Sequence, residues 1–170
     1  GFAMLCEGNV QEVMDLSPVA HLAALSGKVP FINFFDGFRT SHEIQKIAVW
    51  DYKDLADMCD MDAVKAFREH ALNPEHPHMR GSHENGDTFF QHREACNQYY
   101  DALPEVVEKY MGKINEKLGT DYKLFNYYGA PDADRVIIAM GSICDVAEEV
   151  IDYLNAHGEK VGLIKVRLYR

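Results

Sequence analysis

The sequence predicts an α/β fold, and three features of its 170 residues support that prediction. A short apolar run, Val29 to Phe35, stands between two segments with helical periodicity. A second apolar run, "RVIIAM", is followed by an amphipathic helix pattern and then by "EKVGLIKVRLY", the order of a βαβ unit with parallel strands. Hydrophobic residues make up 47% of the chain, so it can bury a sizeable core.

The first predicted helix begins after Asn9, a plausible N-cap. Glu12 stands three residues later, which completes a capping-box pattern. Apolar residues continue at helical spacing to Gly27, where the helix is expected to end. Because proline lacks a backbone N–H, Pro18 is expected either to kink this helix or to divide it into two.

The run from Val29 to Phe35 is apolar except for Asn33, and its aromatic content favours a strand covered on both faces. Asp36 and the glycine after it form a turn signal. Thr40, with a glutamate three residues later, offers a second capping box. A helix is therefore expected to begin near Ser41.

The middle of the chain predicts four more helices. "DYKDLADMC" and "MDAVKAFREHAL" read as two short amphipathic helices, the second capped by Asp60. After Asn73 the segment "NPEHPHMRGSHENGD" has no periodicity and is expected to be an exposed excursion. Two helices then follow, near Phe89 to Ala102 and from Pro104 to Leu118, with Gly119 as the stop.

The character of the sequence changes again at "DYKLFNYYGAPDADR". A short aromatic extended piece precedes a Gly-Ala-Pro-Asp linker, which is the best candidate for a domain boundary. The βαβ pattern follows. Gly141 and Ser142 after its first strand lack the full G-x-G-x-x-G pattern, so we expect them to permit close helix–sheet packing and not to bind a dinucleotide.

Charge and composition exclude several classes of partner. The formal net charge is −10, which argues against nucleic acid or an anionic membrane surface. No apolar run reaches the roughly 20 residues that span a bilayer, and a cytoplasmic or organelle-matrix location is expected. The cysteines are scattered and are expected to be separate reduced thiols; they are Cys6, Cys59, Cys96 and Cys144.

The candidate site residues follow the first predicted strand, since ligands of open α/β sheets bind at the carboxyl ends of strands. They are Asp36, Arg39, Thr40, Ser41 and His42. In one interpretation Arg39 holds a carboxylate or phosphate while Thr40 or Ser41 adds a hydroxyl contact. In the other, this is a capped helix in which Asp36 and Arg39 form a structural ion pair.

Histidines gather in the middle of the chain, at His70, His76, His78, His83 and His92. Imidazoles are good transition-metal ligands, but this spacing matches no known metal motif, and a solvated loop is expected. No nucleophile-plus-base pair is visible either.

The stretch "QEVMDLSPVAHLAALSGKVPFINFFDGFRTSHEIQKI" closely resembles pyruvate:ferredoxin (flavodoxin) oxidoreductases. The phrase "FFDGFRTSHE", at Phe34 to Glu43, is specific to that family, and "YKLFNYYGAPDADRVIIAMGS" is similar to the same enzymes. The resemblance covers essentially the whole chain. It implies part of an oxidoreductase that oxidatively decarboxylates pyruvate to acetyl-CoA and CO₂.

By this resemblance, residues 1–128 are the later part of a thiamine-pyrimidine-binding domain. Residues 129–134 are a linker, and residues 135–170 begin a transketolase-C-terminal-like domain with an incomplete βαβ unit. The expected fold is thus a partial thiamine-diphosphate-binding-type domain followed by part of a second α/β domain.

The resemblance also implies cofactors and partners. The cofactors are thiamine diphosphate, Mg²⁺ and [4Fe-4S] clusters, with CoA as co-substrate, and the partners are ferredoxin or flavodoxin and a second copy in a homodimer. The family's catalytic groups and cofactor ligands lie outside these residues, so no catalytic, cofactor-binding or metal residue is transferred. The segment alone is expected to be inactive, and Asp36, Arg39, Thr40, Ser41 and His42 are expected to support the active site or a domain interface.

Two other classes of function stay open at this point. One is a freestanding, non-catalytic α/β interaction module. Two features argue against it: the sequence starts without Met, and it ends on a strand whose continuation is absent. The other is a small metal-dependent enzyme built on the histidines, which predicts stoichiometric bound metal.

Overall fold

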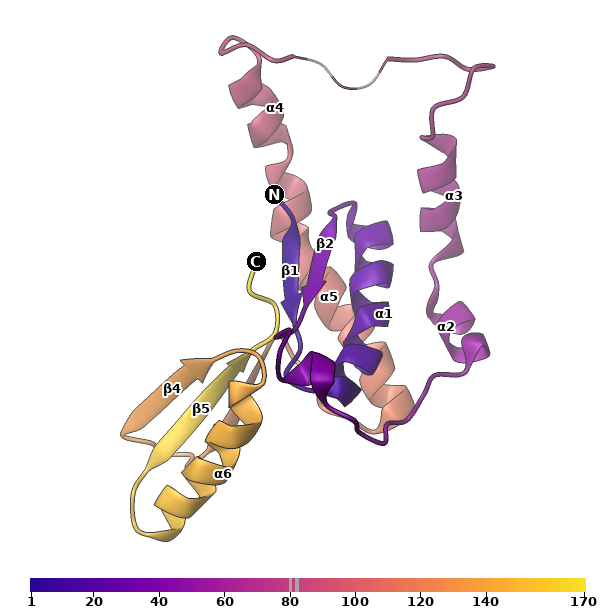
Figure 1. Ribbon diagram of the computed structural model, residues 1–170. Coiled ribbons are helices and arrows are strands. Elements are labelled where there is room, and N and C mark those ends of the chain that lie inside the picture. Colours follow the sequence, from indigo (N-terminus) through magenta and orange to yellow (C-terminus); the bar gives the residue numbers. More distant parts are fainter. Residues whose placement is uncertain (80, 82) are drawn as a thin grey trace.

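The computed structural model describes residues 1–79, 81 and 83–170 and confirms the α/β prediction (Figure 1). Its elements, in chain order, are β1 (Ala3–Cys6), α1 (Val10–Gly27), β2 (Phe31–Phe34), the 3₁₀ turn η1 (Thr40–His42), α2 (Tyr52–Met58), α3 (Met61–Glu69), α4 (Phe89–Ala95), α5 (Asn97–Leu118), β3 (Phe125–Gly129), β4 (Arg135–Ala139), α6 (Ile143–Ala156) and β5 (Val161–Val166).

The first unit is built on β1, α1 and β2. The two strands are parallel and pair from Ala3 opposite Phe31 to Cys6 opposite Phe34. Strand β1 was not predicted, because its four residues are too short to show a period. The helices α1 and α5 pack together and share a core of fully buried side chains, among them Leu16, Val107 and Ile114.

Helix α1 begins as predicted and is not divided by its proline. The Asn9 side chain accepts a hydrogen bond from the Glu12 N–H (2.9 Å), while the Glu12 carboxylate accepts one from the Gly8 N–H (2.9 Å). Pro18 has no N–H for the carbonyl of Met14, four residues earlier. The Trp50 indole N–H donates to that carbonyl instead, at 3.1 Å, so a side chain from another segment satisfies the exposed acceptor.

Two sequence predictions for this unit are wrong. No α-helix begins at Ser41: only η1 forms, because the backbone N–H and the hydroxyl of Thr40 both bond to Asp36 and leave no capping group for a longer helix. Strand β2 is not covered on both faces, since the Ile32 side chain is 42% exposed.

The predicted break at Pro104 is also wrong. Helix α5 runs through it, and the helices divide earlier, at Cys96. An interior proline costs about 3 kcal/mol, but one face of α5, including Val107 and Ile114, is buried in the core, and this packing outweighs the cost. Gly119 ends the helix in the left-handed region (φ +71°), as expected.

The remaining middle segment follows the predictions. Helices α2 and α3 form, and the Asp60 side chain caps α3 by accepting from the Ala63 N–H at 3.0 Å. The predicted excursion after Asn73 is exposed where it is described, apart from a half-buried Glu84, while Arg80 and Ser82 lie outside the described residues. No helix in the described ranges is long and apolar enough to cross a membrane.

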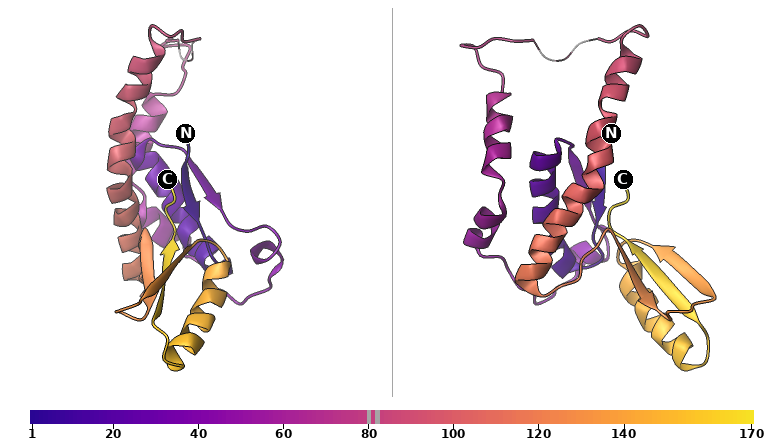
Figure 2. Two further views of the ribbon diagram at one scale, coloured as in Figure 1. Left: turned by 90° about the vertical axis from the view of Figure 1, so that its left-hand side faces the viewer. Right: turned by 180° about the vertical axis from the view of Figure 1, so that it is seen from behind.

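The second unit is a three-stranded sheet in the order β3-β5-β4, with α6 packed against it (Figures 1 and 2). Strands β4 and β5 are parallel and are connected through α6, which confirms the predicted βαβ unit. Strand β3 is the aromatic extended piece, and it pairs with β5 antiparallel. Cys144, Ile151 and Leu163 are buried between helix and sheet.

The run after β5 returns to the first unit, so that the two termini lie close together (Figure 2). The Cys6 N–H donates to the Arg167 carbonyl (2.8 Å), and Leu5 faces Leu168 in an antiparallel bridge. Residues 167–170 therefore lie against β1 on the side opposite β2, which joins the two units through backbone hydrogen bonds.

Candidate functional site

Asp36 stands two residues after β2 and connects the two units. Its Oδ1 accepts the Ser142 N–H (3.1 Å) and its Oδ2 accepts the Ser142 hydroxyl (2.9 Å), at the start of α6. The same carboxylate accepts from the Thr40 hydroxyl (3.3 Å) and N–H (3.4 Å). Desolvation acts to raise the pKa of Asp36, but the hydrogen bonds from Ser142 and Thr40 outweigh it and hold that pKa below its usual value. Asp36 therefore serves as an anionic cap for α6.

Two glycines permit this close approach. Gly141 has a φ of +80°, a left-handed backbone conformation that favours glycine. A Cβ on Gly8 would lie 3.3 Å from the Gly141 carbonyl. The small residues before α6 thus bring it close to the first unit, a contact that the expected helix–sheet packing did not include.

The other three candidate residues form no hydrogen bond to Ser142 or to the Asp36 carboxylate among the described residues. Arg39, Ser41 and His42 are exposed, and the guanidinium of Arg39 has no ion-pair partner within the described ranges. The alternative with an Asp36–Arg39 ion pair is therefore wrong. His42 Nδ1 lies 2.9 Å from the Ser41 hydroxyl and 3.3 Å from the Gly37 carbonyl, so the turn's polar groups bond to one another.

A buried ion pair, which the sequence analysis missed, forms a second contact between the units. An Arg167 Nη donates to Glu12 at 2.7 Å, and their side chains are only 6% and 12% exposed. The guanidinium also donates to the Asn126 side chain and lies over the Tyr122 ring, 5.2 Å from its centroid. An arginine inside the apolar run "KVRLY" was the available signal, but its partner is 155 residues away.

The polar network continues into the first unit. The Tyr122 hydroxyl donates to buried Asp15 at 2.8 Å, and the Gln11 amide donates to the same carboxylate at 2.9 Å. Burial, followed by the hydrogen bond to Asp15, raises the pKa of Tyr122 above its usual range. Gln11 also exchanges two hydrogen bonds with the backbone of Ala48, which holds the following segment against α1.

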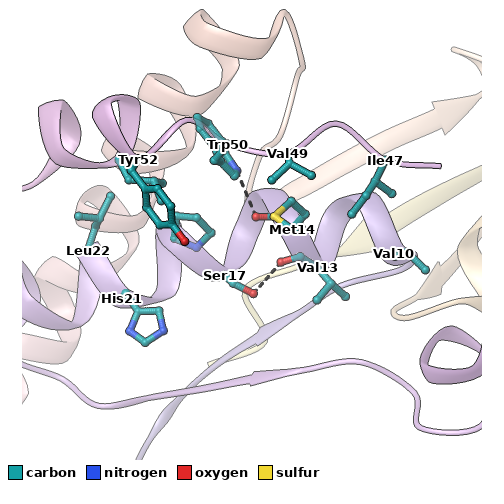
Figure 3. Close-up of a pocket in the computed structure, with 12 residues that line it drawn as sticks. Val10, Val13, Met14, Ser17, His21, Leu22, Ile47, Val49, Trp50 and Tyr52 are labelled. Atoms are coloured by element: carbon teal, nitrogen blue, oxygen red, sulfur yellow. Dashed lines mark hydrogen bonds between the residues drawn. The ribbon is translucent and has the colours of Figure 1, made fainter. Parts of the chain in front are cut away.

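That segment and α1 enclose an apolar groove of about 660 Å³ (Figure 3). Figure 3 shows Trp50 donating to Met14, with Val13, Val49 and Tyr52 around the same space. The groove contains His21 and Ser17 but no carboxylate, lysine or arginine. Its walls can accept an apolar group, and the Ser17 hydroxyl donates to the Val13 carbonyl at 2.6 Å and so is not paired with His21 as a nucleophile with its base.

Metal ligands are not assembled in this part of the protein. Among the described residues, no group of three or more His, Cys, Asp or Glu side chains could hold a metal ion. The His92 imidazole pairs with the Glu84 carboxylate, and the four cysteines are free thiols. The contacts that the described residues do form between the units include a helix cap at Ser142 and the Glu12–Arg167 ion pair.

Comparison with known proteins accounts for both units. Residues 1–112 match the family model described as pyruvate flavodoxin/ferredoxin oxidoreductase, thiamine diphosphate-binding, and residues 133–170 match pyruvate:ferredoxin oxidoreductase core domain II. The pyruvate-flavodoxin oxidoreductase of Enterobacter agglomerans is 64% identical over the whole chain, and the pyruvate:ferredoxin oxidoreductase of Moorella thermoacetica is 60% identical. The chain spans 14% of the length of these relatives.

A solved structure shares the fold. It is a 2-oxoglutarate:ferredoxin oxidoreductase from Magnetococcus marinus, with a TM-score of 0.54 and 20% sequence identity. The similarity covers 98% of this chain and 30% of that one.

Proposed function

Because the chain belongs to the pyruvate flavodoxin/ferredoxin oxidoreductase family, we propose that it is part of an enzyme that oxidatively decarboxylates pyruvate to acetyl-CoA and CO₂. The observation that carries the proposal is the 60–64% identity to such enzymes over every residue of the chain. Electrons would pass to ferredoxin or flavodoxin, the acceptors in the relatives' names.

Thiamine diphosphate is the cofactor that the matched family model names, and we propose that the complete protein binds it together with Mg²⁺, [4Fe-4S] clusters and CoA. The described residues do not fit these groups as ligands, since they contain no set of side chains for a metal ion. The Asp36 carboxylate at the α6 N-terminus occupies the place where a phosphate would otherwise bind. Ligands for the cofactors would come from the rest of the protein.

The proposed role of this segment is to hold two domains in register. We take residues 1–128 as the later part of the thiamine-pyrimidine-binding domain, 129–134 as a linker and 135–170 as the start of the transketolase-C-terminal-like domain. The matches to residues 1–112 and 133–170 support this division. Strand β3 runs into the proposed linker and pairs with β5, which lies after it, so the end of the first domain is hydrogen-bonded to the sheet of the second.

Within this role, the candidate site residues divide into two groups. Asp36 forms the contact with Ser142 across the two domains, and Thr40 donates hydrogen bonds to the same Asp36 carboxylate. Arg39, Ser41 and His42 face outward, and we propose that they support the active site or an interface with another part of the enzyme. The complete protein would be a homodimer in the cytoplasm or an organelle matrix.

The test is pyruvate- and CoA-dependent reduction of a one-electron dye by the purified full-length protein. The proposal expects reduction that requires both substrates, and it expects the 170-residue segment alone to be inactive. The proposal would be refuted if the full-length protein, loaded with thiamine diphosphate and iron–sulfur clusters, did not reduce the dye when given pyruvate or any other 2-oxoacid.

A further inference from the structure

Glu7 is a buried carboxyl group without a partner. It directly follows β1, and its N–H extends the strand pairing by donating to the Phe34 carbonyl at 3.0 Å. The residue is 0% exposed, and neither side-chain oxygen has a hydrogen-bond partner among the described residues. Because both oxygens are inaccessible, no other part of the protein can reach them unless this region first opens.

The location of Glu7 is the contact between the two units. The residue before it, Cys6, donates its N–H to the Arg167 carbonyl at 2.8 Å. The residue after it, Gly8, lies directly against the Gly141 carbonyl at the start of α6. Separation of this contact would let water reach the Glu7 carboxylate, and a buried unpaired charge costs far more than a buried neutral carboxyl.

The surrounding charges do not compensate a negative Glu7. From α1, the Glu12 carboxylate faces it and opposes ionisation. Asp36, from the turn after β2, and Cys144, from the start of α6, act in the same direction on the neighbouring Cys6. The buried cation of this region, Arg167, is paired with Glu12 at 2.7 Å. Burial first, and then the charge of Glu12, raise the pKa of Glu7 to about 8.

We propose that Glu7 is a proton-dependent lock on the contact between the two units: the contact is closed while Glu7 carries a proton and opens when the proton leaves to solvent. This inference does not depend on the proposed enzymatic activity. It assigns to Glu7 control over the packing of β1 against residues 167–170 and the start of α6.

The direction of the effect follows from linkage. A carboxyl whose folded pKa is raised from 4.5 to about 8 binds more protons in the closed state than in the open one. The stability that the Glu7 proton gives to the closed state is therefore complete below the ordinary pKa of 4.5, and it is lost as pH rises toward the folded pKa of about 8. Over pH 6 to 8 the open fraction should rise about 50-fold, and above pH 8 the rise should level off.

Hydrogen–deuterium exchange of the intact full-length protein, resolved by peptide and corrected for the pH dependence of intrinsic exchange, measures this opening. We expect protection of residues 3–8 and 142–147 to fall with pH in the wild type and to be nearly independent of pH in Glu7→Gln. The matched control is Glu105→Gln, an exposed position on α5, which should keep the wild-type pH dependence.

The wild type alone can overturn the proposal, so the outcome does not depend on whether Glu7→Gln folds. Corrected protection at residues 3–8 that stays constant between pH 6 and 8 would show that Glu7 is not such a lock. So would a Glu7→Gln variant with an unchanged pH dependence, because another group would then be responsible. Either result leaves the pyruvate assay unaffected.

Discussion

Replacement of Arg167 by methionine is the most informative perturbation of the contact between the two units. Methionine keeps much of the length and apolar volume of the arginine stem but removes the guanidinium. Among the described residues, the Glu12 carboxylate, 12% exposed, would be left with its hydrogen bond from the Gly8 N–H at 2.9 Å. The Asn126 side-chain oxygen would also lose a donor.

The expected cost follows from that burial. Removal of one partner of a buried ion pair leaves an uncompensated charge and typically costs about 3–5 kcal/mol. Arg167→Met should therefore lower the free energy of unfolding by about that amount. Adding Glu12→Gln removes the orphaned charge and keeps an acceptor for Gly8, so the double variant should be more stable than Arg167→Met alone.

Urea unfolding of the chain, followed by the fluorescence of Trp50, its single tryptophan, would measure these differences. Arg170→Met is the matched control, because Arg170 is exposed, and it should change stability by less than about 0.5 kcal/mol. A loss below about 1 kcal/mol for Arg167→Met, or a double variant no more stable than the single one, would refute the claim that this pair holds the units together.

Two further predictions concern Trp50 and Asp36. Trp50→Phe should cost about 1–3 kcal/mol by leaving the Met14 carbonyl without a donor. Because this variant lacks the tryptophan, its urea unfolding is followed by far-UV circular dichroism. The same change in a Pro18→Ala background should cost less, because alanine restores the helical N–H, and equal costs would contradict this explanation. Asp36, whose pKa is lowered in the folded state, should contribute stability that is complete above its unfolded pKa of 3.8 and lost as pH falls through the folded value. Unfolding curves between pH 2 and 6 should show less acid sensitivity in Asp36→Asn than in the wild type. An identical pH profile would show that ionised Asp36 does not stabilise the fold.

Local signals explain why much of the fold could be predicted from sequence. The caps at Asn9 and Asp60 and the stop at Gly119 each depend on residues within a few positions, and all three form as expected. The βαβ order of the second unit likewise follows from alternating local patterns.

The failures occur where distant residues decide the outcome. Thr40 carries a capping signal, yet its hydroxyl and N–H donate to Asp36. The same Asp36 carboxylate accepts hydrogen bonds from Ser142, at the start of a helix 106 residues further along the chain. Pro18 and Pro104 stand inside continuous helices because tertiary contacts offset their cost: an indole donor for the first, and core packing of α5 for the second.

The candidate site was predicted only in part for the same reason. Asp36 was identified from its place after a strand, but Ser142 could be connected with it only through the folded arrangement of two units. The Glu12–Arg167 pair carries no local motif, since each residue alone is compatible with an exposed position.

The most direct test of the proposed function is release of labelled CO₂ from pyruvate carrying ¹³C at its carboxyl group. The measurement uses the full-length protein loaded with thiamine diphosphate and supplied with CoA and oxidised ferredoxin or flavodoxin. We expect ¹³CO₂ and acetyl-CoA to form in equal amounts, and neither to form when thiamine diphosphate is removed. Loaded protein that binds pyruvate yet releases no ¹³CO₂ would contradict it.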